Sequence, residues 1–290
     1  MTFGDGFLSS RKVAVVTDSL SADFYFPKWH DYYGRLFGHS ALHVATLAGS
    51  EGLFSAFPLA EVRTIHASYD DSDRLTFITS YVEELLETHD VVVRVDTDEF
   101  LVAEPRLYHD LRDYVDRLDQ PYVTARGFDV FQKSEEPPLD LRRPILGEQR
   151  GFAFGLSALC KTAITSVPLT WDRGFHMTST PPVFHHLYLF HMKRADIDLQ
   201  ERWNAYMAVR IHNDPFIRGY YETPRSQIEA FHAELSRRGT EEGDEALNRT
   251  EYLSRVMDAV RFDQGSGMWV YSHDLDTVNV TIPPRFRGLI

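Results

Sequence analysis

Short apolar runs alternate with amphipathic segments along the first third of the chain. Residues 12–17 and 42–47 are apolar runs that predict buried strands, and residues 62–69 predict another. Aromatic residues at helical spacing over 27–38, closed by Gly38 where a C-terminal cap belongs, predict one helix, and the apolar spacing from Leu75 to Leu86 predicts a second. A further strand begins at Val91. This alternation predicts an α/β fold whose mixed, mostly parallel central sheet is covered by helices on both faces.

The rest of the chain has weaker patterns. A helix is predicted over residues 105–118, a strand over 122–130, and two late helices over 226–238 and 249–260. Residues 133–150 are charged and rich in proline, which predicts a mobile loop with little to bury.

Composition and charge limit the partners. The formal net charge of −13 argues against a nucleic-acid partner, because nucleic-acid binders carry a basic face, so any bound phosphate must be held by a metal or by a few cations. Cys160 is the single cysteine and cannot form an intramolecular disulfide. The chain begins without the pattern of a signal peptide, and no stretch reads as a transmembrane segment, so we expect a cytoplasmic protein.

One short stretch looks unlike core packing. Asp96, Asp98 and Glu99 interrupt an apolar run within four positions. Strand alternation places Asp96 and Asp98 on one face and Thr97 and Glu99 on the other, and two carboxylates on one face at a strand end form a hard-oxygen site suited to Mg²⁺ or Mn²⁺. The alternative is an acidic turn that caps the helix beginning near Pro105. Arg94 falls on the same face, where it would either pair with the acids or contact a phosphate.

The run from His89 to Leu101, with the amphipathic helix before it, resembles the Asp-x-Asp-Glu-Phe segment of nucleotide-sugar glycosyltransferases of the GT-A fold, in the branch close to family 2. Residues 174–194, rich in histidine, resemble the late strand of the same branch, where a histidine joins the acids at the metal. The resemblance covers roughly residues 12–203. It implies a Rossmann-like three-layer sandwich, followed here by a helical C-terminal extension. Thr17-Asp18-Ser19-Leu20 departs from the Asn-Glu pair that often follows the first strand in the family.

The resemblance implies a metal site. Asp98 would coordinate the ion directly, Asp96 would bind it less directly and contact the donor ribose, and His191 would be the third ligand. Three other histidines compete for that place: His176, His185 and His186. Strand alternation puts His185 on the face of His191 and His186 on the opposite face, where we expect it to pack.

The resemblance also implies donor and acceptor contacts. Lys193 and Arg194 are placed at the diphosphate, although a solvated pair of cations at a strand end explains them equally well. Asp70 is placed at the base, although an acidic helix cap explains the cluster of Asp70, Asp71 and Arg74 equally well. Asp18, Arg74 and Arg94 complete the predicted donor-binding set.

For the acceptor, Asp172 is the predicted general base of an inverting reaction, and Trp171 and Phe175 would either stack on the acceptor or pack in the core.

The sequence therefore predicts a single domain over residues 1–290. Residues 12–130 would form the nucleotide-sugar half, residues 131–210 the acceptor and metal-completing half, and residues 211–290 a helical tail. The predicted function is Mn²⁺- or Mg²⁺-dependent transfer of a sugar from a UDP- or GDP-linked donor to a small-molecule or glycan acceptor. Two rivals stay open, a metal-dependent phosphoesterase and a non-catalytic nucleotide-sugar-binding protein.

Overall fold

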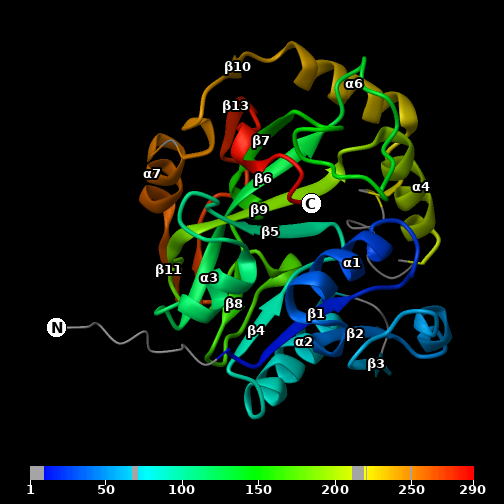
Figure 1. The fold of residues 1–290 in the computed structure, drawn as a ribbon, viewed down its shortest axis with the longest axis vertical. Helices are drawn as coiled ribbons and strands as arrows, with labels where there is room; N and C mark the ends of the chain where they lie inside the picture. The colour runs from blue at the N-terminus through cyan, green and yellow to red at the C-terminus, as the bar shows by residue number, and fades with distance from the viewer. Residues whose placement is uncertain (1–9, 67–70, 211–218, 220, 249) are drawn as a thin grey trace.

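A computed structural model describes residues 10–66, 71–210, 219, 221–248 and 250–290. In this part of the chain, eleven strands form one mixed β-sheet, shown in Figure 1, with the order β10-β13-β7-β6-β8-β4-β1-β2-β3 and with β9 pairing β5 and β6. The α/β class predicted from the sequence is confirmed.

The N-terminal half of the sheet is parallel. The strands β1 (Val13–Asp18), β2 (Leu42–Leu47), β3 (Glu61–Ile65) and β4 (Val91–Arg94) lie in the order β4-β1-β2-β3. They alternate with the helices α1 (Phe26–Phe37) and α2 (Asp71–Leu86) in the predicted order. Gly38 ends α1 with a φ of 86° and donates its N–H to the Gly34 carbonyl, as its place in the sequence predicted.

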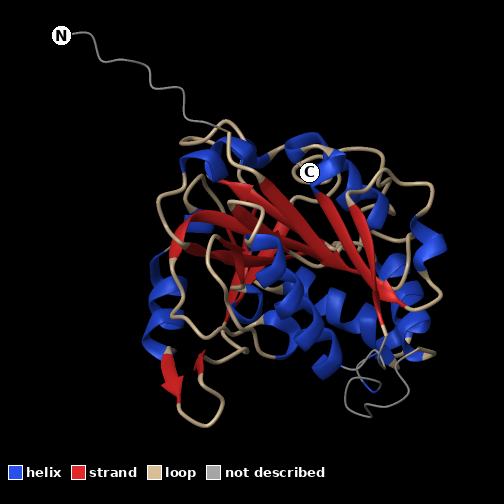
Figure 2. Ribbon diagram, turned by 90° about the horizontal axis from the view of Figure 1, so that it is seen from below, coloured by secondary structure: helices blue, strands red, loops and turns tan. Residues whose placement is uncertain are grey.

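The two faces of this half follow from strand alternation. In β1, Val13 and Val15 pack into the core beneath α1, whereas Ala14 and Val16 pack on the other face against α2. Helices lie on both faces of the strands in Figure 2. The result is the three-layer arrangement expected for an α/β sheet.

The second half of the sheet is largely antiparallel and was only partly predicted. Its strands are β5 (Glu99–Ala103), β6 (Tyr122–Phe131), β7 (Phe152–Leu156), β8 (Thr162–Thr165) and β9 (Phe184–Arg194). The helix predicted over 105–118 is shorter, α3 (Leu111–Arg117), and α4 (Ile197–Ala208) was not predicted. The strand β9 is the longest in this half and carries the predicted histidine segment between β5 and β6.

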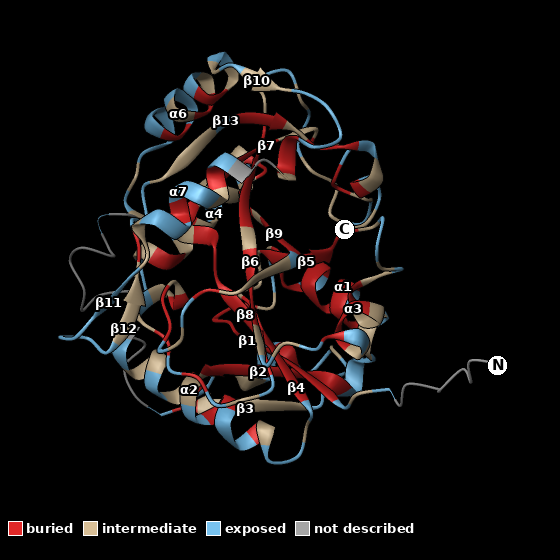
Figure 3. Cartoon of the chain, turned by 90° about the vertical axis from the view of Figure 1, so that its left-hand side faces the viewer, coloured by how far each residue is buried: buried red, intermediate tan, exposed pale blue. Residues whose placement is uncertain are grey.

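The C-terminal part contains the two predicted helices, α6 (Arg225–Arg237) and α7 (Thr250–Ala259). It also adds β10 (Thr240–Glu241) and β13 (Asp276–Thr281) to the main sheet, and a separate hairpin of β11 (Arg261–Asp263) and β12 (Met268–Val270). In Figure 3 the buried residues follow the sheet strands through the centre of the molecule. Among the described residues, no helix combines the length and apolar character needed to cross a bilayer.

The loop over 133–150 differs from its prediction. The structure buries Ile145, Leu146 and Arg150 completely. Arg150 donates to the main-chain carbonyls of Ala195, at 2.5 Å, and Pro137, at 2.8 Å. The assumption that this charged segment has little to bury was therefore wrong, because a buried guanidinium satisfies carbonyls on both sides of it.

Candidate active site at the acidic turn between β4 and β5

The acidic stretch is a turn and not a continued strand. The strand β4 ends at Arg94, β5 begins at Glu99, and the Glu99 N–H donates to the Asp96 carbonyl at 3.1 Å to close the turn. Asp96 and Asp98 therefore lie in a turn and not on one strand face, and the prediction from strand alternation was wrong. The two carboxylates contact different groups.

Asp96 lies in a buried network of acids and cations. Its Oδ1 accepts from Arg94 at 2.7 Å and from Arg74 at 3.1 Å, and its Oδ2 accepts from Lys161 Nζ at 2.9 Å. These three cations compensate the acidic turn. Arg94 thus pairs with the acids, one of the two roles its position predicted.

The same cations hold the ends of two neighbouring strands together. The Asp18 carboxylate, at the end of β1, accepts from Arg94 at 2.8 Å and from Arg74 at 2.5 Å. Burial acts to raise the pKa of both Asp18 and Asp96, but Arg74 and Arg94 at Asp18, and Arg94, Lys161 and Arg74 at Asp96, outweigh it and lower both pKa values. Both acids are therefore held as carboxylates.

The network is closed on one side by an aromatic ring. The short helix η4 (Arg173–Phe175) places the Phe175 ring under the Arg94 guanidinium, with 3.3 Å between its Cζ and the ring centroid. Phe175 is 2% exposed, so of its two predicted roles the structure shows core packing. Lys161 also forms an ion pair with Glu99, at 2.6 Å.

Asp98 contacts the predicted histidine. Its Oδ2 lies 3.4 Å from His191 Nε2, and the other ring nitrogen, Nδ1, lies 3.1 Å from Oδ1 of Asp129. The contact follows from the register, because Glu99 pairs His191 across β5 and β9, and the Met192 N–H donates to the Asp98 carbonyl at 2.8 Å. Burial opposes a charge on this imidazole, but Asp98 and Asp129 outweigh it and raise the pKa of His191 to about 10. The two carboxylates therefore favour the protonated form of the ring.

A narrow cleft opens beside Asp98. Its lining residues come from the segment before α1, the acidic turn, the end of β9, and α4: Phe24, Tyr25, Thr97, Asp98, Lys193, Leu199, Gln200 and Trp203. Lys193, predicted to bind the donor, thus faces the same space as the predicted metal ligand. Its Nζ also lies 4.8 Å from the centroid of the Tyr221 ring.

Asp172 and His176 make contacts with the main chain near η4. Asp172 caps η4, its Oδ1 accepting from the Arg173 N–H at 2.7 Å. His176 Nδ1 lies 2.5 Å from the Ala158 carbonyl oxygen. Asp70 lies outside the described residues, so its proposed base contact stays a prediction.

Two other histidines of β9 lie too far from His191 to take its place as the metal ligand. His185 and His186 are at the opposite end of β9 from His191, about 20 Å away at the usual rise of a strand. His186 is exposed, so the expectation that it packs was wrong.

Sequence reasoning missed Lys161 and Asp129. Lys161 comes directly before β8 and is buried, and Asp129 is an acid inside the apolar run Phe128–Phe131 of β6. A charge within a buried strand needs a partner, so Asp129 carried a usable signal. The identity of the partner depended on the strand order.

Comparisons with known proteins leave the family open. No family model and no curated protein matches the chain. A solved structure of mannose-1-phosphate geranyltransferase from Thermus thermophilus is similar at 9% identity and a TM-score of 0.28, covering 76% of this chain and 68% of the other. A structure of CMP:2-keto-3-deoxy-manno-octonic acid synthetase with CTP is similar at 16% identity and a TM-score of 0.26, covering 66% and 77%. Similarity this low carries no inference about this protein.

Proposed function

We propose that this protein is a metal-dependent glycosyltransferase that moves a sugar from a nucleoside-diphosphate donor to an acceptor hydroxyl. The observation that supports it most is the convergence of Asp98 and His191 Nε2 at 3.4 Å, beside a cleft that Lys193 also lines. Because the turn follows parallel strand β4, the site lies beyond the carboxyl end of the parallel half, where α/β sheets bind ligands.

The residues fit a divalent ion that takes some of its ligands from the protein and the rest from substrate and water. Among the described residues there is no group of three or more acids, histidines or cysteines that could hold a metal. Mg²⁺ and similar ions commonly take one or two protein ligands and complete their shell with water and phosphate oxygens. Asp98 and His191 suit such a site. Asp96 has both oxygens engaged by cations, so the proposal gives it a role in the buried network.

A Mn²⁺ or Mg²⁺ ion there would offset the charge that develops on the leaving diphosphate. The chain's own groups have separate tasks in the proposal. Asp98 and His191 hold the ion, Lys193 contacts the diphosphate, and the acidic network keeps the turn in place. Asp172 would accept the proton of the acceptor hydroxyl. The donor would be a UDP- or GDP-linked sugar, and the acceptor a small molecule or glycan.

Calorimetric titration tests the metal site. Nucleoside diphosphate should bind more tightly with Mn²⁺ than with EDTA, and Asp98→Asn should remove most of that gain, because the amide keeps the shape of the carboxylate but not its charge. Asp113→Asn, which removes a carboxylate from an i,i+4 pair with Arg117 on α3, is the matched control and should keep the gain. Equal affinity with Mn²⁺ and with EDTA in the unmodified protein would remove the metal from the proposal.

Measurements of donor turnover distinguish the proposed glycosyltransferase from the two alternative functions. A glycosyltransferase should consume donor much faster when acceptor is present, a phosphoesterase should release phosphate from simple esters, and a binding protein should retain donor without turnover. Donor consumption across an acceptor panel, measured with Mn²⁺, distinguishes the three outcomes. Phosphate release from simple esters without sugar transfer would contradict the proposed function.

A further inference from the structure

Asp129 is a completely buried acid in the middle of β6. The strands β6 and β9 are parallel neighbours, and their register pairs Asp129 with His191. Burying a carboxylate is costly unless it is paired and hydrogen-bonded. Its partners should therefore show why this strand carries an acid between Phe128 and Val130.

Both carboxylate oxygens of Asp129 have partners from β9. Oδ1 lies 3.1 Å from His191 Nδ1, and Oδ2 accepts from Nη1 of Arg194. The Arg194 guanidinium lies over the Phe231 ring, with 5.1 Å between its Cζ and the ring centroid, so α6 packs behind the pair. Asp129 is 0% exposed, whereas the His191 side chain is 13% exposed. The imidazole thus lies between Asp129 and Asp98 and links the two carboxylates.

The contact with Asp129 determines which ring nitrogen of His191 faces Asp98. A neutral imidazole carries one N–H, and the hydrogen bond that one nitrogen makes decides which nitrogen keeps a lone pair. Once the ring has given up its second proton, donation from Nδ1 to Asp129 leaves the lone pair on Nε2, the nitrogen that lies 3.4 Å from Asp98 Oδ2. A carboxylate behind a histidine also makes that histidine a stronger ligand.

We propose that Asp129, held by Arg194, is a positioning residue that presents His191 Nε2 to a divalent ion beside Asp98. This inference rests on the proposed function and extends it to a residue that does not touch substrate or metal. The proposed role also explains why β6 carries Asp129, because this acid orients His191 on the neighbouring strand β9.

Mn²⁺ affinity measured by electron paramagnetic resonance tests the proposal without any turnover. Asp129→Asn should weaken Mn²⁺ binding by roughly 10- to 100-fold, the usual effect of losing such a partner. Glu104→Gln is the matched control, since the Glu104 side chain is equally buried at 3% exposure and is bonded to Arg285 at 2.7 Å and Tyr188 at 2.8 Å, away from His191. This control should lose stability but keep its Mn²⁺ affinity.

A double-mutant cycle separates positioning from general damage. In a His191→Gln background, Asp129→Asn should lower Mn²⁺ affinity little further, because the group it orients is gone. Additive losses of Mn²⁺ affinity in the double variant would overturn the inference. So would a normal Mn²⁺ affinity in Asp129→Asn when His191→Gln lowers that affinity. If the unmodified protein binds no Mn²⁺, with or without nucleoside diphosphate, the proposed function fails first and this inference fails with it.

Nuclear magnetic resonance provides a second measurement on the unmodified protein, should Asp129→Asn not fold. Long-range ¹H–¹⁵N spectra with saturating Mg²⁺, assigned against His191→Gln, should show the ring proton of His191 on Nδ1 and none on Nε2. A proton on Nε2, with or without one on Nδ1, would overturn the inference.

Discussion

At the scale of single residues, Asp172 combines an observed structural role with a proposed chemical one. It caps η4, and it is the predicted base for the acceptor. Asn is as good a cap as Asp, so Asp172→Asn should keep the turn and remove only the base. We expect nearly unchanged donor and metal affinity and a transfer rate lower by about 100-fold.

Initial rates at saturating donor and acceptor measure this effect. Asp110→Asn, which changes the cap of α3 in the same way, is the matched control and should transfer sugar at the normal rate. Normal transfer by Asp172→Asn would leave the reaction without this base and would favour a retaining outcome, which the anomeric configuration of the product would reveal.

His43, in β2 against α2, is expected to make stability depend on pH. It is 6% exposed, and its Nδ1 lies 2.7 Å from the Tyr81 hydroxyl. Burial, helped by His89, lowers the pKa of His43 from 6.5 to about 4. The unfolded chain therefore binds more protons between these values, so the contribution of neutral His43 is fully present above pH 6.5 and is lost as pH falls toward 4.

We expect His43→Asn, which can keep a hydrogen bond to Tyr81, to flatten this dependence. Between pH 7 and 4, the free energy of unfolding should fall by up to about 3 kcal/mol more in the unmodified protein than in the variant. Urea denaturation at several pH values measures the difference. Parallel curves for the two proteins would show that His43 does not titrate in this window.

At the scale of elements, the turn between β4 and β5 depends on a cation from outside it. Lys161, directly before β8, pairs with Asp96 at 2.9 Å and Glu99 at 2.6 Å and is 5% exposed. Burial raises the pKa of Glu99 although Lys161 opposes it, while the cations around Asp96 lower its pKa despite burial. Without Lys161, the buried Glu99 and the partly exposed Asp96 lie close together with less compensation.

Lys161→Met should therefore lower the free energy of unfolding by about 3–5 kcal/mol, the usual cost of leaving a buried charge unpaired. Adding Glu99→Gln should recover part of the loss, because the amide removes one acid and can still accept the Asp96 N–H that Glu99 accepts at 3.0 Å. Chemical denaturation of the single and double variants measures the recovery. A double variant less stable than Lys161→Met would show that repulsion at the turn is not the cause.

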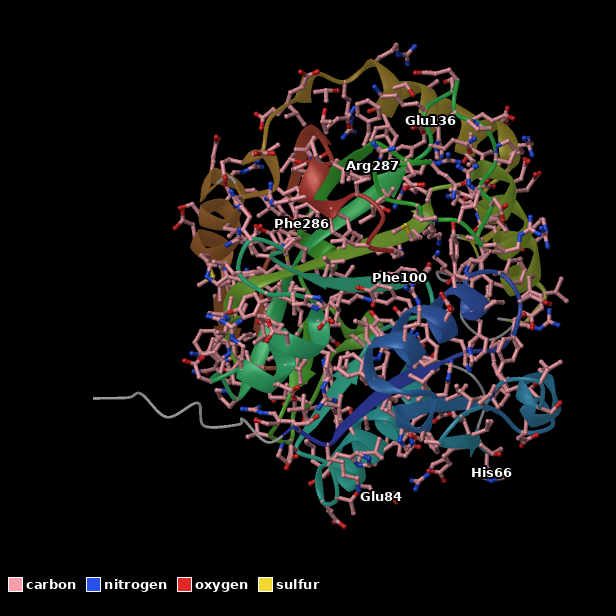
Figure 4. All side chains as sticks on the ribbon, in the orientation of Figure 1. His66, Glu84, Phe100, Glu136, Phe286 and Arg287 are labelled. Atoms are coloured by element: carbon pink, nitrogen blue, oxygen red, sulfur yellow. The ribbon has the colours of Figure 1, made fainter. Side chains whose placement is uncertain are left out.

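At the scale of the whole molecule, one core joins the two ends of the chain. The largest buried cluster includes residues from Val13 to Ile290. Phe286, labelled in Figure 4, is completely buried, and its ring centroid lies 5.1 Å from that of Tyr188 and 5.5 Å from that of Phe190. The C-terminal segment thus packs against β9, the strand that carries His191.

Phe286→Ala should lower the free energy of unfolding by about 3–5 kcal/mol, because it leaves a cavity among these rings. Phe262→Ala is the control, since Phe262 is 50% exposed on the β11–β12 hairpin and should change stability by less than about 0.5 kcal/mol. Denaturation of both variants measures the difference. Similar small effects would mean that the C-terminal segment contributes little to the core.

The sequence by itself determined the features that depend on local periodicity. The order of the first six elements, the bounds of β2 and the Gly38 cap could all be predicted, because apolar spacing is visible over a few residues. Pairing with the acids was one of two roles predicted for Arg94. The contact of His191 with Asp98 came from a family resemblance and is now seen in the register of β5 and β9.

The tertiary structure alone decided which distant charges meet. Lys161 is 65 residues from Asp96, and Asp129 is 62 residues from His191, and only strand order and register bring each pair together. The turn at Asp96 was also decided here, because β5 leaves β4 to pair with β9, which separates the two carboxylates that strand alternation would have aligned. The local sequence pattern indicates the type of each element and the face that it buries. The partner of a buried charge depends on how the strands assemble into the sheet.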